Sequence, residues 1–219
     1  MRGGRPAWWV LATVVAAGSS ASAHRLDECL QAARIAIEPG AITLEIDLTP
    51  GVDVAGTMVS DVDRDRDGVL SPLEQQAFVT RVFAAAEIAV DGRPGTVSPL
   101  PATFPDVPAM LRGEGTIQLR ATIPLQPQSA GSHEVFFRNG YQAVTSAYLA
   151  NALVPESDRV AIRSQRRDAQ QRDLTIDYEL RSDGPPQWTW LFGGLAVAAA
   201  VAGLKKKIPS DIAAQNSGS

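Results

Sequence analysis

The chain of 219 residues carries a formal net charge of −4, and all three of its lysines lie together at positions 205–207. Residues 24–187 hold 15 arginines against 23 aspartates and glutamates, a net charge of −8 that excludes nucleic acid as a partner. The single cysteine, Cys29, excludes an intramolecular disulfide and a Cys-x-x-Cys metal site.

The N-terminal residues 1–23 have the features of a secretory signal peptide. Two arginines supply a positive start, a short apolar run extends from Trp8 to Ala17, and Ala21-Ser22-Ala23 is a cleavage sequence of small residues. The apolar run is too short to span a bilayer comfortably. The mature protein is therefore predicted to begin at His24, on the periplasmic or extracellular side of a membrane.

A β-hairpin is predicted to open the folded part of the chain. Apolar and polar residues alternate strictly over residues 42–48, which is the period-two pattern of a half-buried strand. An apolar segment at residues 35–37 precedes this strand, and Pro39-Gly40 between the two segments favours a turn.

The twelve residues 63–74 follow the pattern D-x-D-x-D-G-x5-E, which is typical of a calcium loop. Calcium takes roughly six to eight oxygen ligands, and Gly68 at the sixth position allows the sharp turn that gathers them. The predicted metal ligands are the side chains of Asp63, Asp65, Asp67, Ser71 and Glu74 together with the main-chain carbonyl of Val69. The alternative is an acidic surface turn that binds no ion.

Apolar residues recur at helical spacing on both sides of this loop. They are Ala55, Met58, Val59 and Val62 before the loop, and Phe78, Val79, Val82 and Phe83 after it. With these flanks, residues 52–86 resemble an EF-hand, which consists of a helix, a calcium loop and a second helix. The resemblance implies Ca²⁺ as the bound ion and a structural role for it within the insert.

Short strands are predicted to dominate the remainder of the chain up to residue 187. Strand patterns occur at 88–90, 116–125, 132–138, 148–154, 159–164 and 174–180. Residues 96–108 are proline-rich and irregular, with an edge strand as the most regular structure expected there. Asp91-Gly92 favours a tight hairpin turn. We therefore expect a mainly β fold for residues 24–187, an antiparallel β-sandwich with the EF-hand-like insert between its second and third strands.

The C-terminal part of the chain is predicted to contain a transmembrane helix. Residues 188–204 form an uncharged apolar run with Trp188 and Trp190 at one end and the three lysines at the other, as the aromatic-belt and positive-inside rules expect. Residues 205–219 would form a cytoplasmic tail, which gives a single-pass topology. The alternative for the apolar run is a buried core helix.

Function classes other than calcium binding rest on fewer residues. The chain has two histidines and no G-x-S-x-G motif, so we expect no enzyme activity. If cleavage follows Ala23, the amine and imidazole of His24 form a nitrogen pair suited to copper or nickel, with His133, Asp27 or Glu28 completing the site. The mature start also resembles that of nickel/cobalt permease-like membrane proteins, which implies a neighbouring membrane protein as a partner. The simpler interpretation is that His24 is an ordinary polar first residue.

Overall fold

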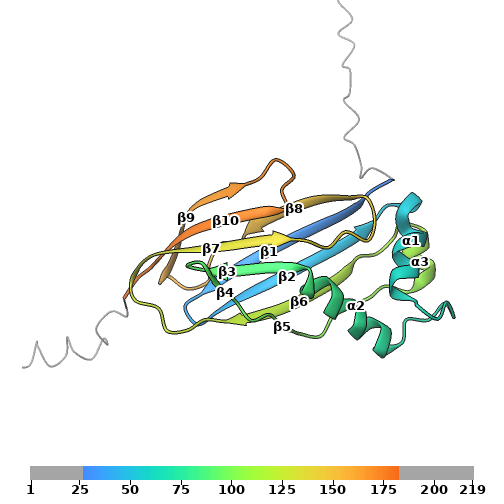
Figure 1. The fold of residues 1–219 in the computed structure, drawn as a ribbon, viewed down its shortest axis with the longest axis horizontal. Helices are drawn as coiled ribbons and strands as arrows, with labels where there is room; N and C mark the ends of the chain where they lie inside the picture. The colour runs from blue at the N-terminus through green and yellow to red at the C-terminus, as the bar shows by residue number, and fades with distance from the viewer. Residues whose placement is uncertain (1–26, 183–219) are drawn as a thin grey trace, which may run out of the picture.

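The computed structural model describes residues 27–182 and shows a mainly β protein built from two five-stranded sheets (Figure 1). The first sheet has the order β5 (Ser98–Pro99), β6 (Ile117–Pro124), β2 (Ala41–Pro50), β1 (Cys29–Glu38) and β8 (Ser146–Ala152). The second has the order β4 (Arg93–Pro94), β3 (Ala86–Val90), β7 (Gly131–Asn139), β10 (Asp173–Leu180) and β9 (Val160–Arg167).

Strand pairing is antiparallel throughout both sheets with one exception. Strand β8 pairs with β1 in parallel, from Cys29 opposite Ser146 to Ile35 opposite Ala152. The expectation of a wholly antiparallel fold is therefore wrong at this pair. The chain does not turn back in a hairpin after β7, because residues 140–145 cross from the second sheet to the first and deliver β8 alongside β1.

The two sheets share one hydrophobic core. Along β2 every second residue is buried, as the strict alternation over residues 42–48 predicts. The core receives Ile35, Ile37, Ile42, Leu44, Ile46, Leu48, Ile117, Leu119 and Ile123 from the first sheet, and Ile88, Val135, Phe137, Leu174, Ile176, Tyr178 and Leu180 from the second. Burial of both inner faces in one cluster is what holds the sheets together.

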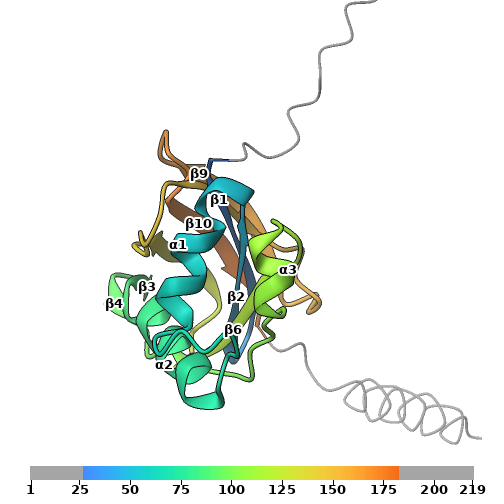
Figure 2. The same ribbon diagram turned by 90° about the vertical axis from the view of Figure 1, so that its right-hand side faces the viewer.

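Two helices lie between β2 and β3, at the end of the sheets opposite to the point where the chain leaves β10 (Figure 1). They are α1 (Val52–Val62) and α2 (Pro72–Ala84), and Figure 2 shows them from that end. Their buried residues are the eight apolar residues that the helical spacing singles out. All but Ala55 belong to the common core, so the helices pack on the β-domain and do not stand apart from it.

The proline-rich segment contains the edge strand that its sequence allows and one helix that it does not predict. Residues 98–99 form the short edge strand β5, and a third helix, α3 (Val107–Leu111), follows. The Asp106 side chain caps this helix by accepting a hydrogen bond from the Ala109 amide at 2.6 Å.

The predicted signal peptide and the apolar run at 188–204 lie outside the described residues. Within residues 27–182, no helix is long and apolar enough to cross a membrane.

Candidate metal centre

The loop between α1 and α2 is held at both ends by its own residues. Helix α1 ends at Val62, and Asp63 is its C-terminal cap. Helix α2 begins with a capping box: the Ser71 hydroxyl accepts from the Glu74 amide, and the Glu74 carboxylate accepts from the Ser71 amide at 3.0 Å. Pro72 occupies the first turn, where the absence of an amide hydrogen costs nothing.

Three aspartates shape the loop through hydrogen bonds to its own main chain. Asp63 Oδ2 accepts from the Gly68 amide at 3.0 Å, Asp65 Oδ1 from the Asp67 amide at 3.2 Å, and Asp67 Oδ1 from the Val69 amide at 2.7 Å. Gly68 has a φ of +82°, in the left-handed region that glycine adopts without strain. These bonds wrap the main chain around the carboxylates.

The carboxylates of Asp63, Asp65 and Asp67 converge, with one oxygen of each lying within 4.8 Å of the other two. Asp65 and Asp67 are exposed, whereas Asp63 is only 4% exposed. The Oδ1 atom of Asp63 is buried and accepts no hydrogen bond from the described part of the chain. A buried carboxylate oxygen without a donor is costly, and a bound cation would remove that cost. The donor set therefore fits a hard divalent cation.

Glu74 does not belong to this group of converging carboxylates, because its oxygens accept hydrogen bonds from other loop residues. Glu74 Oε1 accepts from the Arg64 and Asp65 amides at 2.6 and 3.3 Å, and its Oε2 accepts from Ser71. Both oxygens of Glu74 and the Ser71 hydroxyl are thus engaged within the loop. Val69, the predicted carbonyl ligand, is 65% exposed.

The pKa values of two loop acids are shifted in opposite directions, one raised by desolvation and neighbouring charge and the other lowered by hydrogen bonds. The hydrogen bond from the Asp67 amide lowers the pKa of Asp65, but desolvation and the charges of Asp67 and Glu74 outweigh it, and the pKa is raised overall. The pKa of Glu74 is lowered, chiefly because the Ser71 hydroxyl and amide donate to its carboxylate. The loop therefore concentrates negative charge that a cation would neutralise.

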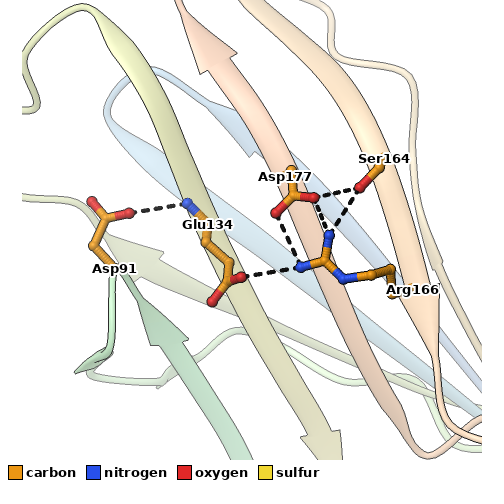
Figure 3. A network of polar contacts seen from close by, with 5 residues as sticks. All are labelled: Asp91, Glu134, Ser164, Arg166 and Asp177. Atoms are coloured by element: carbon orange, nitrogen blue, oxygen red, sulfur yellow. Dashed lines mark hydrogen bonds and ion pairs between the residues drawn. The ribbon is translucent and has the colours of Figure 1, made fainter.

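Carboxylates on the outer face of the second sheet are neutralised by arginine (Figure 3). Arg166 on β9 pairs with Asp177 on β10 and, at 3.2 Å, with Glu134 on β7, while Ser164 also hydrogen-bonds to Asp177. No ion pair of this kind reaches the three loop aspartates from any described residue. Among the described residues, the loop differs from this network in bringing three carboxylates together without an arginine.

His133 has no free ring nitrogen with which to ligate a metal. Its Nδ1 lies 2.8 Å from Asp91 Oδ2 and its Nε2 lies 2.8 Å from the Ser129 carbonyl oxygen. The side chain is 10% exposed and packs on the Tyr178 ring. His24, the centre of the alternative copper or nickel site, lies outside the described residues, so that hypothesis stays a prediction from the sequence.

Two residues beside the loop escaped the sequence prediction. Asp61, on the last turn of α1, accepts a hydrogen bond at 2.6 Å from the Tyr141 hydroxyl, which comes from the segment between β7 and β8. Eighty positions separate the two residues, and no local pattern in the sequence indicates such a contact.

Comparison with protein-family models, with curated proteins and with solved structures finds no match.

Proposed function

We propose that the protein binds calcium through an EF-hand-like insert at residues 52–86 of a β-sandwich domain. The ligands would be Asp63, Asp65, Asp67, Ser71 and Glu74 through their side chains and Val69 through its carbonyl. The observation that carries the proposal is the buried Oδ1 of Asp63, which receives no hydrogen bond from residues 27–182 and lies in a cluster of three converging carboxylates. An ordinary acidic surface turn has no reason to bury a carboxylate in this way.

The proposed role of the ion is structural. A bound cation would neutralise the mutual repulsion of the loop carboxylates. The main-chain amides of Gly68, Asp67 and Val69 already hold the aspartates in a curved loop, so little ordering would be needed on binding. Glu74 would have to exchange its present hydrogen bonds for the ion. Because α1 and α2 are packed into the common core, tightening the loop between them stabilises the whole domain.

We further propose that the protein acts outside the cytoplasm as a membrane-anchored domain without enzyme activity. This arrangement combines a signal peptide at residues 1–23, an extracytoplasmic domain at 24–187, a transmembrane helix at 188–204 and a cytoplasmic tail at 205–219. A neighbouring membrane protein would be its partner. Calcium modules outside cells bind with dissociation constants of about 10⁻⁴–10⁻³ M, which suits a site that stays occupied.

Thermal unfolding of the full chain in calcium, in magnesium and in chelator tests the proposal. With a dissociation constant of ~10⁻⁴ M, ~2 mM calcium adds about 1.8 kcal/mol to the free energy of unfolding. The expected rise in Tm is roughly 4–7 °C for a domain of this size. Magnesium should raise Tm less, because it demands octahedral geometry and retains its waters.

Asp63→Asn is the decisive variant in this experiment. The amide retains an oxygen for the Gly68 bond but removes the buried charge, so the calcium-dependent rise in Tm should disappear. Asp53→Asn in the first turn of α1 is the matched control, since it removes the same charge outside the loop and should leave the rise intact. Equal Tm values for the unmodified chain in calcium, magnesium and chelator would contradict the proposed function.

A further inference from the structure

Arg64 lies between the first two carboxylates of the loop, yet its guanidinium is bound outside the loop. Its Nη2 donates to Asp61 Oδ1 at 2.7 Å, three residues back on α1. Only the main-chain amide of Arg64 contributes to the loop, by donating to Glu74 Oε1 at 2.6 Å. A positive charge that the sequence places beside the ligands is thereby withdrawn from them.

The carboxylate that holds Arg64 is itself fixed by the β-domain. The Tyr141 hydroxyl donates to Asp61 Oδ2 at 2.6 Å, and Arg81 on α2 lies 3.4 Å from Asp61 Oδ1 and also donates to the Asp61 carbonyl. Tyr141 is 6% exposed and packs edge-to-face on Phe78, with ring centroids 5.7 Å apart. Asp61 is therefore a preorganised acceptor, and Arg64 is tethered to a rigid point.

Arg66 provides an internal comparison. It occupies the next spacer position of the loop, between Asp65 and Asp67, and its side chain is exposed. No described residue forms an ion pair with its guanidinium. The side chains of the two spacer arginines thus differ in their ion pairs: Arg64 is paired with Asp61, whereas no described residue pairs with Arg66.

We propose that Asp61 is a positioning residue of the ion site, which holds the Arg64 guanidinium outside the loop so that Asp63 and Asp65 meet a cation without a competing positive charge. The inference rests on the proposed function. Without Asp61, the guanidinium would be free to pair with the carboxylates of Asp63 and Asp65, its neighbours in the chain. It would then compete with the ion for the same oxygens and repel it.

Calorimetric titration of the full chain with calcium in about 0.1 M salt tests the proposal through a double-mutant cycle. Asp61→Asn should raise the dissociation constant roughly tenfold, the scale expected for a unit charge brought next to a divalent ion near the surface. Arg64→Gln alone should change it by no more than about twofold. The double variant should return to within about threefold of the unmodified chain, because no guanidinium remains to be released.

Two further variants separate positioning from a merely structural role. Tyr141→Phe removes one contact of Asp61, but Arg81 still holds Asp61 in place and the Arg64 pair is retained, so the variant should lower Tm and leave calcium affinity unchanged. Arg66→Gln should tighten binding more than Arg64→Gln does, because only the Arg66 charge is free. This last comparison keeps Asp61 in place and holds even if Asp61→Asn does not fold.

The outcomes distinguish this inference from the proposed function. No calcium binding by the unmodified chain would overturn the proposed function and, with it, the role of Asp61. Calcium binding with additive effects of Asp61→Asn and Arg64→Gln, or equal tightening by Arg64→Gln and Arg66→Gln, would overturn the positioning role alone.

Discussion

Replacement of Tyr141 by phenylalanine measures how firmly the helical insert is fastened to the sheets. The variant removes the hydroxyl that donates to Asp61 Oδ2 at 2.6 Å and retains the ring that packs on Phe78. Hydrogen bonds to charged groups contribute about 1.5–3 kcal/mol. Asp61 keeps its ion pairs with Arg64 and Arg81, so its carboxylate still has partners after the substitution. The lower end of that range therefore applies.

The expected loss for Tyr141→Phe is therefore about 1.5 kcal/mol, or a fall in Tm of roughly 3–6 °C. Thermal unfolding in chelator provides the measurement without any contribution from bound ion. Tyr148→Phe is the matched control, because its hydroxyl donates at 2.8 Å to a neutral acceptor, the Tyr141 carbonyl. That variant should lose about 0.5–1 kcal/mol. A Tm for Tyr141→Phe equal to or above that of Tyr148→Phe would refute the claim that the Tyr141–Asp61 hydrogen bond fastens the helical insert to the sheets.

The fold supports two more predictions. Gly140→Ala should destabilise the domain by about 2–4 kcal/mol, because a Cβ there would lie 2.2 Å from the Ala85 carbonyl oxygen. In contrast, a Cβ at Gly56 in α1 would meet nothing within 4 Å, so Gly56→Ala should add up to about 1 kcal/mol to the free energy of unfolding. Chemical denaturation of both variants tests this difference. Burial disfavours the charged imidazole of His133, but its bonds to Asp91 and to a main-chain carbonyl outweigh this and raise its pKa. The His133–Asp91 pair therefore stabilises the fold fully below about pH 6.5 and loses this contribution as the pH rises through the raised pKa of His133. Tm should fall over that interval, and His133→Gln should abolish that part of the fall. An unchanged dependence of Tm on pH in the variant would contradict this prediction.

Local patterns in the sequence predict much of the fold. Strand β2 and helices α1 and α2 each bury one face, and this burial gives their sequences a regular apolar period. The period alone is therefore enough to predict these three elements. The sequence predicts only residues 35–37 of strand β1, because Gln31 interrupts the apolar pattern of the earlier part of the strand. The Gln31 side chain is fully buried and hydrogen-bonds to Asn139 and Ser146, which lie near it only in the folded chain.

Long-range features of the site were not available from the sequence. The spacing of the loop singles out Asp63, Asp65 and Asp67, and the structure brings these three together. Ser71 and Glu74 also have the S-x-x-E spacing of a capping box, which is a local feature of the sequence. The spacing of the loop does not indicate that Tyr141 reaches Asp61, or that β8 pairs in parallel with β1, because both depend on how residues 140–145 cross between the sheets.

Calorimetric titration of the full chain with calcium, beside the same titration of Asp63→Asn, tests the central claim most directly. The account predicts one calcium ion per unmodified chain, with a dissociation constant of about 10⁻⁴–10⁻³ M, and no binding by the variant over the same range. Absence of calcium binding by the unmodified chain up to several times ~10⁻³ M, or equal binding by Asp63→Asn, would contradict it.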